Sequence, residues 1–235
     1  MPARRSAFLR GVLASMPFVI VIIPFGLLFG AVATKAGMTL TEIMVFSVMV
    51  IAGAAQFAAV QLMVEDAPLL IVLATALAVN LRMAMYSAAL TPHLGAASLW
   101  TRVVMSYFLV DQSYAASAAE FERRPDQSLS DKVAFFFGAV APVCPLWYLT
   151  SYLGARFGAA IPPQYALDFA VPIAFLAITA PMLRTPAHIA AAVMSVALAL
   201  GFAWLPYSSG LLVAAAGAMA TGALVEIRFG QGARA

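Results

Sequence analysis

Charge is scarce in this chain. Aspartate, glutamate, lysine and arginine together make up 10% of its 235 residues, whereas soluble domains carry about 25%. Hydrophobic residues account for 64%, and the mean hydropathy is +0.97. This composition excludes a soluble globular protein and predicts an integral membrane protein. The longest polar stretch, residues 120–132, is only loop-sized, so we expect a single membrane domain over residues 1–235.

Cysteine and histidine are scarcer still, with one and two residues respectively. A single cysteine excludes an internal disulfide and a multi-cysteine metal cluster. The net charge of +3 comes from scattered basic residues, which argues against binding of nucleic acid. The sequence also lacks a P-loop, a His-Glu-x-x-His helix and a serine nucleophile elbow. We therefore expect neither an enzyme nor an ATP-driven pump, with no metal and no cofactor.

Long apolar runs, in contrast, are abundant. They lie at residues 12–34, 41–63, 68–90, 100–119, 133–153, 168–184, 187–205 and 209–227. Runs of about 20 residues suffice to cross the hydrocarbon core of a bilayer as a helix. The sequence therefore predicts an all-α fold, a polytopic transmembrane helical bundle of about eight spans. Seven spans are the alternative, because very little chain separates the sixth run from the seventh.

Basic residues are distributed unevenly over the segments between these runs. If the N-terminus is cytoplasmic, nine basic residues lie on the cytoplasmic side (Arg4, Arg5, Arg10, Arg123, Arg124, Lys132, Arg184, Arg228 and Arg234) and three on the other (Lys35, Arg102 and Arg156). Short cytoplasmic loops carry the excess of arginine and lysine. We therefore expect both termini to be cytoplasmic, which requires an even number of spans.

Helix-breaking residues lie inside the first two runs. Pro24 and Gly26 weaken the middle of the first run, and Gly53 precedes the amide of Gln56 in the second. A proline removes one backbone hydrogen bond, and carbonyls freed at membrane depth are tolerated where they are buried in protein or line a cavity. We expect helix breaks at these positions, with an ordinary proline kink as the alternative for the first run. Gln56 suits either a zwitterionic substrate or a hydrogen bond between helices.

The third run carries one charge, Arg82, two residues after Asn80 and four before Tyr86. A guanidinium at mid-membrane depth costs roughly 2.5–3.5 kcal/mol on insertion scales unless it faces protein or water. Arg82 and Tyr86 share a helical face, whereas Asn80 lies about 200° away from Arg82 around a regular helix. Two roles are open for Arg82 at this point: binding a substrate carboxylate, or a salt bridge with a neighbouring acid.

The fourth run carries Asp111, taken here as the one acid at comparable depth. Its spacing from Tyr107 and Tyr114 places the three side chains on one face of a continuous helix. Because an unpaired buried charge is far more costly than a compensated pair, we predict that Arg82 and Asp111 interact. A carboxylate in this position is also suited to carrying a proton.

Four short segments together resemble the AzlC family. They are Pro24-Phe25-Gly26, Gly53-Ala-Ala-Gln56-Phe57, Asn80-Leu-Arg82 with Tyr86, and Phe108-Leu-Val-Asp111-Gln-Ser-Tyr114-Ala. They occur in the family's order, and the resemblance covers roughly residues 8–225. Many relatives have Asp-Glu where this chain has Asp111 and Gln112, which puts in doubt any coupling scheme that needs two acids there.

The resemblance implies the large subunit of a two-component exporter in the bacterial inner membrane, driven by the proton motive force. The implied substrates are leucine, isoleucine, valine and sometimes methionine, and the implied partner is a small membrane subunit of the AzlD type. We expect the substrate site to contain Arg82, Asn80, Gln56 and Tyr86, with Asp111 as charge partner or proton carrier. The alternatives are a channel or transporter for another small solute and, less favoured, an intramembrane enzyme.

Overall fold

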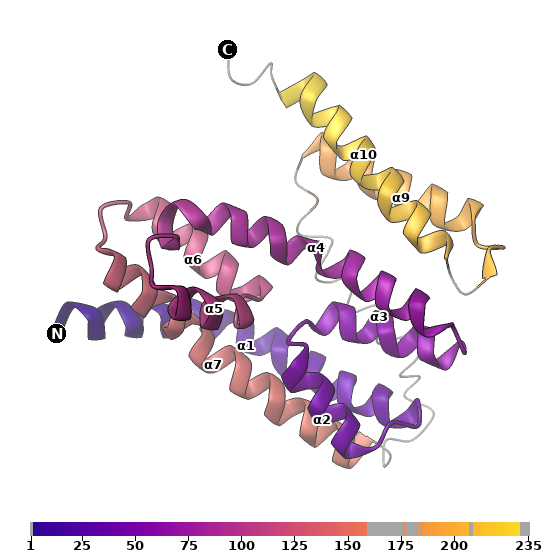
Figure 1. Cartoon of the computed structure of the whole chain (residues 1–235), viewed down its shortest axis with the longest axis horizontal. Coiled ribbons are helices and arrows are strands. Elements are labelled where there is room, and N and C mark those ends of the chain that lie inside the picture. Colours follow the sequence, from indigo (N-terminus) through magenta and orange to yellow (C-terminus); the bar gives the residue numbers. More distant parts are fainter. Residues whose placement is uncertain (1, 159–175, 177–182, 184, 207–208, 231–235) are drawn as a thin grey trace. The chain divides into compact units, whose positions relative to one another are not determined.

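The computed structural model describes residues 2–158, 176, 183, 185–206 and 209–230. Regular structure in this part of the chain consists of nine α-helices (Figure 1). Four of them, α1, α4, α7 and α10, are long and apolar enough to cross a membrane, and α2, α3 and α9 are shorter apolar helices. The predicted class, a polytopic membrane protein built from helices, is confirmed.

The chain forms two compact units, which are described separately. The first consists of Met1–Gln56 with Asn80–Tyr165, and the second of Phe57–Val79 with Ala166–Ala235. The helices of the first unit are α1 (Pro2–Lys35), α2 (Leu40–Met49), the first turn of α3 (Gly53–Val64), the second half of α4 (Leu69–Leu94), α5 (Leu99–Tyr107), α6 (Asp111–Arg123) and α7 (Leu129–Phe157). The second unit holds the remainder of α3 and α4, together with α9 (Pro186–Gly201) and α10 (Gly210–Gly230).

The expected spans correspond to these helices in two different ways. The runs at 12–34, 68–90 and 133–153 each form one long helix, and the last two runs form α9 and α10, which pack against each other. The runs at 41–63 and 100–119 are each split into two shorter helices, α2 with α3 and α5 with α6. The run at 168–184 lies outside the described residues apart from positions 176 and 183.

Helices α1 and α7 pack along each other and form the centre of the first unit (Figure 1). Glycines hold the two backbones in contact. A Cβ on Gly11, Gly30, Gly138 or Gly154 would collide with the carbonyl oxygen of Phe135, Ser151, Phe8 or Leu27, respectively. Small residues at such positions let membrane helices approach closely, so that dispersion forces act over a large contact.

The break expected at Pro24 and Gly26 is not there: α1 runs unbroken through both residues to Lys35. The expectation was wrong because a proline removes only one ladder hydrogen bond, and close packing against α7 supports the rest of the helix. Gly26 serves this packing, since a Cβ there would collide with the Oγ1 atom of Thr150 on α7.

Candidate functional site

Arg82 and Asp111 form an ion pair. The Nη1 atom of Arg82 on α4 lies 3.1 Å from Oδ2 of Asp111, the first residue of α6. The Tyr86 hydroxyl, one turn further along α4, donates a hydrogen bond of 3.0 Å to Oδ1 of the same carboxylate. The contact predicted from the sequence is therefore present, and each oxygen of Asp111 has a different partner.

Asp111 follows an interruption between α5 and α6, at residues 108–110. The buried hydroxyl of Ser113 organises this turn: it accepts a hydrogen bond of 2.9 Å from the Val110 amide and donates to the Phe108 carbonyl at 3.0 Å. The expectation that Tyr107, Asp111 and Tyr114 share one face of a continuous helix was wrong, because the chain leaves helical geometry between Tyr107 and Asp111. Instead, Asp111 lies at a helix N-terminus, where the helix dipole favours a negative charge.

Tyr86 is fixed by a second aromatic ring. The rings of Tyr86 and Tyr114 are stacked, with centroids 4.1 Å apart and planes inclined by 8°. Tyr114 lies one turn after Asp111 on α6. The stack and the hydroxyl contact thus join α4 to α6 at the same place as the ion pair, and they orient Tyr86 toward Asp111.

The structure does not bring Asn80 and Gln56 into this cluster through any hydrogen bond or ion pair between described residues. Asn80 precedes Arg82 by two positions in the uninterrupted helix α4, so its side chain leaves the helix about 200° away from that of Arg82. The Oδ1 atom of Asn80, an acceptor, and the Nε atom of Arg82, a donor, are both buried. Neither forms a hydrogen bond with a described residue. Gln56 is fully buried near the start of α3.

A tyrosine connects the two interrupted regions of the first unit. Between α2 and α3 the Ala52 amide binds the Val50 carbonyl at 2.9 Å, so it does not serve Val48, its partner in a regular helix. The hydroxyl of Tyr107, the last residue of α5, donates to the Val48 carbonyl instead. The same hydroxyl lies 3.1 Å from the Tyr148 hydroxyl on α7. The interruption before Gly53 and the interruption before Asp111 are thus linked through one side chain.

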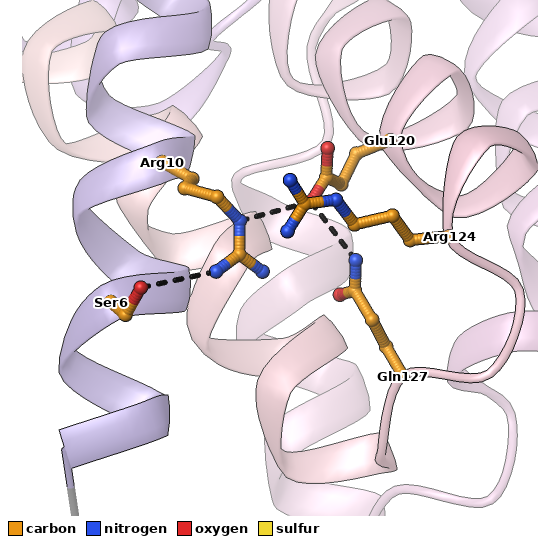
Figure 2. Close-up of polar contacts among 5 residues, drawn as sticks. All are labelled: Ser6, Arg10, Glu120, Arg124 and Gln127. Carbon is orange, nitrogen blue, oxygen red and sulfur yellow. Dashed lines mark hydrogen bonds and ion pairs between the residues drawn. The ribbon is translucent and has the colours of Figure 1, made fainter.

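A second acid, Glu120, is buried in α6 (Figure 2). Its Oε1 atom accepts hydrogen bonds from Nε of Arg10 at 3.1 Å and from Nε2 of Gln127 at 2.9 Å, and lies 3.8 Å from Nε of Arg124. The Arg10 guanidinium also donates to the Ser6 hydroxyl at 3.3 Å. The cluster of Arg10, Glu120, Arg124 and Gln127 joins the first part of α1 to the end of α6.

The sequence interpretation missed this acid, because it assigned Glu120 to a polar loop and took Asp111 as the one deep acid. In fact the Glu120 side chain is 6% exposed and the Asp111 side chain 39%. A signal was available: the buried positions of α6 are Ser113, Ala116, Ser117, Glu120 and Phe121. Their spacing of three and four residues is that of one helical face, and it runs through Glu120.

Two curated relatives are similar to most of the chain. An uncharacterized membrane protein of Archaeoglobus fulgidus is 29% identical over 220 residues, covering 91% of this chain and 93% of the relative. The inner membrane protein YgaZ of Escherichia coli (strain K12) is 28% identical over 187 residues, covering 74% and 73%. No solved structure matches the chain.

The pattern of the AzlC protein family matches residues 17–161. This range includes both interrupted regions, the ion pair of Arg82 with Asp111, and Glu120. The match covers more than half of the sequence, as expected from the resemblance of the four short segments. The chain belongs to the AzlC family.

Proposed function

We propose that this protein is the large subunit of a two-component exporter, driven by the proton motive force, of the branched-chain amino acids leucine, isoleucine and valine, with methionine as an additional substrate. Membership of the AzlC family and the polytopic helical fold support a transporter over an enzyme. The name of the Escherichia coli relative, an inner membrane protein, supports location in the bacterial inner membrane.

The observation that carries the proposal is the ion pair between Arg82 and Asp111, at the interruption between α5 and α6. An aliphatic amino acid is a zwitterion with one group for each partner. The planar guanidinium of Arg82 suits two carboxylate oxygens, and the carboxylate of Asp111 suits the ammonium. Tyr86, whose hydroxyl donates to Asp111, would complete the site, whereas Asn80 and Gln56 form no hydrogen bond with it in the described part of the chain. A bound zwitterion thus replaces the internal ion pair without leaving either charge uncompensated.

Competition between a proton and the substrate for Asp111 would couple amino acid transport to proton movement. A proton and the ammonium of the substrate both neutralise the same carboxylate, so binding of one opposes binding of the other. With the zwitterion bound the site is neutral, and with a proton on Asp111 it carries the single positive charge of Arg82. Export in the neutral form and return in the protonated form move one charge inward for each amino acid, which uses both the pH gradient and the membrane potential.

The charge cluster around Glu120 supports the proposed orientation. Arg10 of α1 and Arg124, the residue directly after α6, meet at the same carboxylate (Figure 2), so two basic segments assigned to the cytoplasmic side lie close together in the first unit. Placing this cluster on the cytoplasmic side agrees with the excess of basic residues in short cytoplasmic loops. The N-terminus is then cytoplasmic. A cytoplasmic C-terminus rests on the even number of spans expected from the sequence, and cysteine labelling from either side of the membrane tests both positions.

The experiment that tests the function is leucine transport in liposomes containing this chain together with its AzlD-type small membrane partner. We expect leucine to move against its gradient when a pH gradient or a membrane potential is imposed, with inward charge movement. Liposomes with this chain alone should show no such transport. Leucine flux that does not change with the pH gradient or the membrane potential would indicate a channel. Full transport by this chain alone would contradict the two-component proposal.

A further inference from the structure

Helix α3 begins without a side-chain cap. The hydroxyls of Thr39, Ser98, Ser128 and Thr185 accept amide hydrogen bonds at the starts of α2, α5, α7 and α9. The residue before Gly53 is Ala52, which has no side-chain acceptor. The Gln56 amide is bonded to the Ala52 carbonyl at 3.0 Å, so the amides of Gly53, Ala54 and Ala55 precede the first hydrogen bond of the helix and point out of its end.

Two buried polar side chains lie at this end of α3. The amide atoms of Gln56 and the Nε1 atom of Trp147 have no hydrogen-bond partner in the part of the chain that the structure describes. Gln56 is fully buried, and Trp147 is 6% exposed. Helical side chains lean toward the helix N-terminus, which directs the Gln56 amide back along the first turn.

The ring of Trp147 lies directly on Gly53. A Cβ on this glycine would be 2.9 Å from Cη2 of Trp147 and 3.1 Å from Cε1 of Phe25. The contact is made by Cη2 and Cζ3, at the six-membered end of the indole, so the N–H lies on the other part of the ring, about one ring width from the start of α3. Leaving a buried donor or acceptor unpaired costs roughly 1–3 kcal/mol, so such groups in native structures call for an explanation, and a bound ligand is one.

The groups at this position suit a carboxylate. The indole group is a donor only, the amides at the start of α3 are donors, and the N-terminus of a helix carries a partial positive charge of roughly half a unit. No acidic residue lies in the first turn of α3. The surroundings are apolar and aromatic: the ring centroids of Phe25 and Phe29 lie 6.1 Å and 5.7 Å from that of Trp147.

We propose that the start of α3, with Gln56 and Trp147, is a second binding station for the exported amino acid. It would hold the carboxylate on the α3 amides and the aliphatic side chain against the aromatic rings. It is separate from the pair of Arg82 and Asp111, and it rests on the proposed function for the identity of the substrate. The bond from Tyr107 to Val48 links the two stations, because each lies at one of the two helix interruptions.

Two compounds that each contain part of the leucine molecule test the second station separately from the first. In full-length chain with Trp100→Phe and Trp204→Phe, Trp147 is the remaining tryptophan, and its fluorescence reports on its own surroundings. We expect saturable quenching by 4-methylpentanoate, which has the carboxylate and side chain of leucine, and none by 3-methylbutylamine, which lacks the carboxylate. Gln56→Leu should weaken 4-methylpentanoate binding about tenfold, and Gln61→Leu, on the exposed side of the same helix, should not.

Arg82→Lys tells this station apart from the proposed transport site. Binding of 4-methylpentanoate should survive this substitution, and survive Asp111→Asn. Loss of binding with either, or unchanged affinity in Gln56→Leu, would overturn the second station while leaving the exporter proposal standing. If leucine transport fails in liposomes but 4-methylpentanoate still binds, the exporter proposal is the one at fault. Binding of radiolabelled 4-methylpentanoate to the chain with all its tryptophans checks the fluorescence result. Thermal unfolding of Gln56→Leu checks that this variant is folded.

Discussion

The two acids of α6 have opposite surroundings. Glu120 is almost completely buried, and Arg10, Arg124 and Gln127 all direct nitrogen atoms at its Oε1 atom. Asp111, nine residues earlier at the start of the same helix, is partly exposed and has Arg82 on one oxygen and Tyr86 on the other. A carboxylate enclosed by donors from α1 and from the connection after α6 is suited to holding helices together. A carboxylate that neighbouring side chains leave partly uncovered, with one charged partner, can exchange that partner for a proton or an ammonium group.

The strongest test of this contrast is Asp111→Asn. We expect leucine export driven by the proton motive force to fall to background, because an amide cannot carry the proton. Exchange of leucine for leucine across the membrane should persist, since the asparagine oxygen can still accept a hydrogen bond from an ammonium group. Transport in liposomes measures both activities.

Asp126→Asn, at an exposed position beyond α6, is the matched control and should export normally. Export by Asp111→Asn that still follows the imposed proton gradient would remove Asp111 from the coupling mechanism.

Glu120→Gln should affect stability instead of coupling. Removing one partner of a buried ion pair costs about 3–5 kcal/mol, and the partial exposure of Arg10 and Arg124 lowers the expected loss to about 2 kcal/mol. Thermal unfolding in detergent and abundance in the membrane should both show it, whereas transport per folded molecule should stay close to that of the wild type.

Glu122→Gln changes an exposed acid two residues away on α6 and controls for loss of charge. If Glu120→Gln is as stable as this control, the cluster around Glu120 does not hold α1 to α6.

Replacing arginine by lysine compares the basic partners of the two acids, Arg82 beside Asp111 and Arg10 beside Glu120. Arg82→Lys keeps the charge but loses the planar fork that suits a carboxylate, so leucine export at matched abundance should fall about tenfold or more. Arg10→Lys should leave export nearly unchanged, because a lysine ammonium can still reach Glu120. Equal export by the two variants would indicate that Arg82 has a structural role only.

Tyr86→Phe should have the smallest effect, a reduction of export of about threefold, because one hydrogen bond to a partly exposed carboxylate is lost. The stack on Tyr114 should hold the phenylalanine ring in place. Tyr152→Phe, on an exposed position of α7, is the control. A loss as large as that of Asp111→Asn would mean that the Tyr86 hydroxyl takes part in proton transfer.

The sequence was sufficient for the features that depend on a single conspicuous residue. Arg82 and Asp111 were found because a charge in an apolar run must be compensated, and their pairing follows from that requirement alone. The interruption before Gly53 was predicted from small residues next to a buried amide, and the separation of Asn80 from Arg82 follows from the helical period.

The features that depend on tertiary packing were not accessible in the same way. Pro24 breaks no helix, because α7 supports α1 on both sides of it. Gly26, two residues away, marks this contact, but from the sequence alone we expect a helix breaker there. The interruption before Asp111 is built by Ser113, whose hydroxyl replaces helical partners only once the turn has formed. Glu120 was hidden by its position at the edge of a polar stretch, although the spacing of the small residues before it carried the signal.

The glycine contact between α1 and α7 has a consequence for how the protein is made. Gly30 and Gly154 lie 124 residues apart in sequence, the difference between their positions. At a synthesis rate of about 5–20 residues per second, α1 waits on the order of ten seconds in the bilayer before α7 emerges to cover its glycine face. During that time lipid, or the insertion machinery, must occupy the surface that α7 later takes. The first unit is therefore completed by its last helix, and a chain truncated before residue 129 would leave α1 without its main partner.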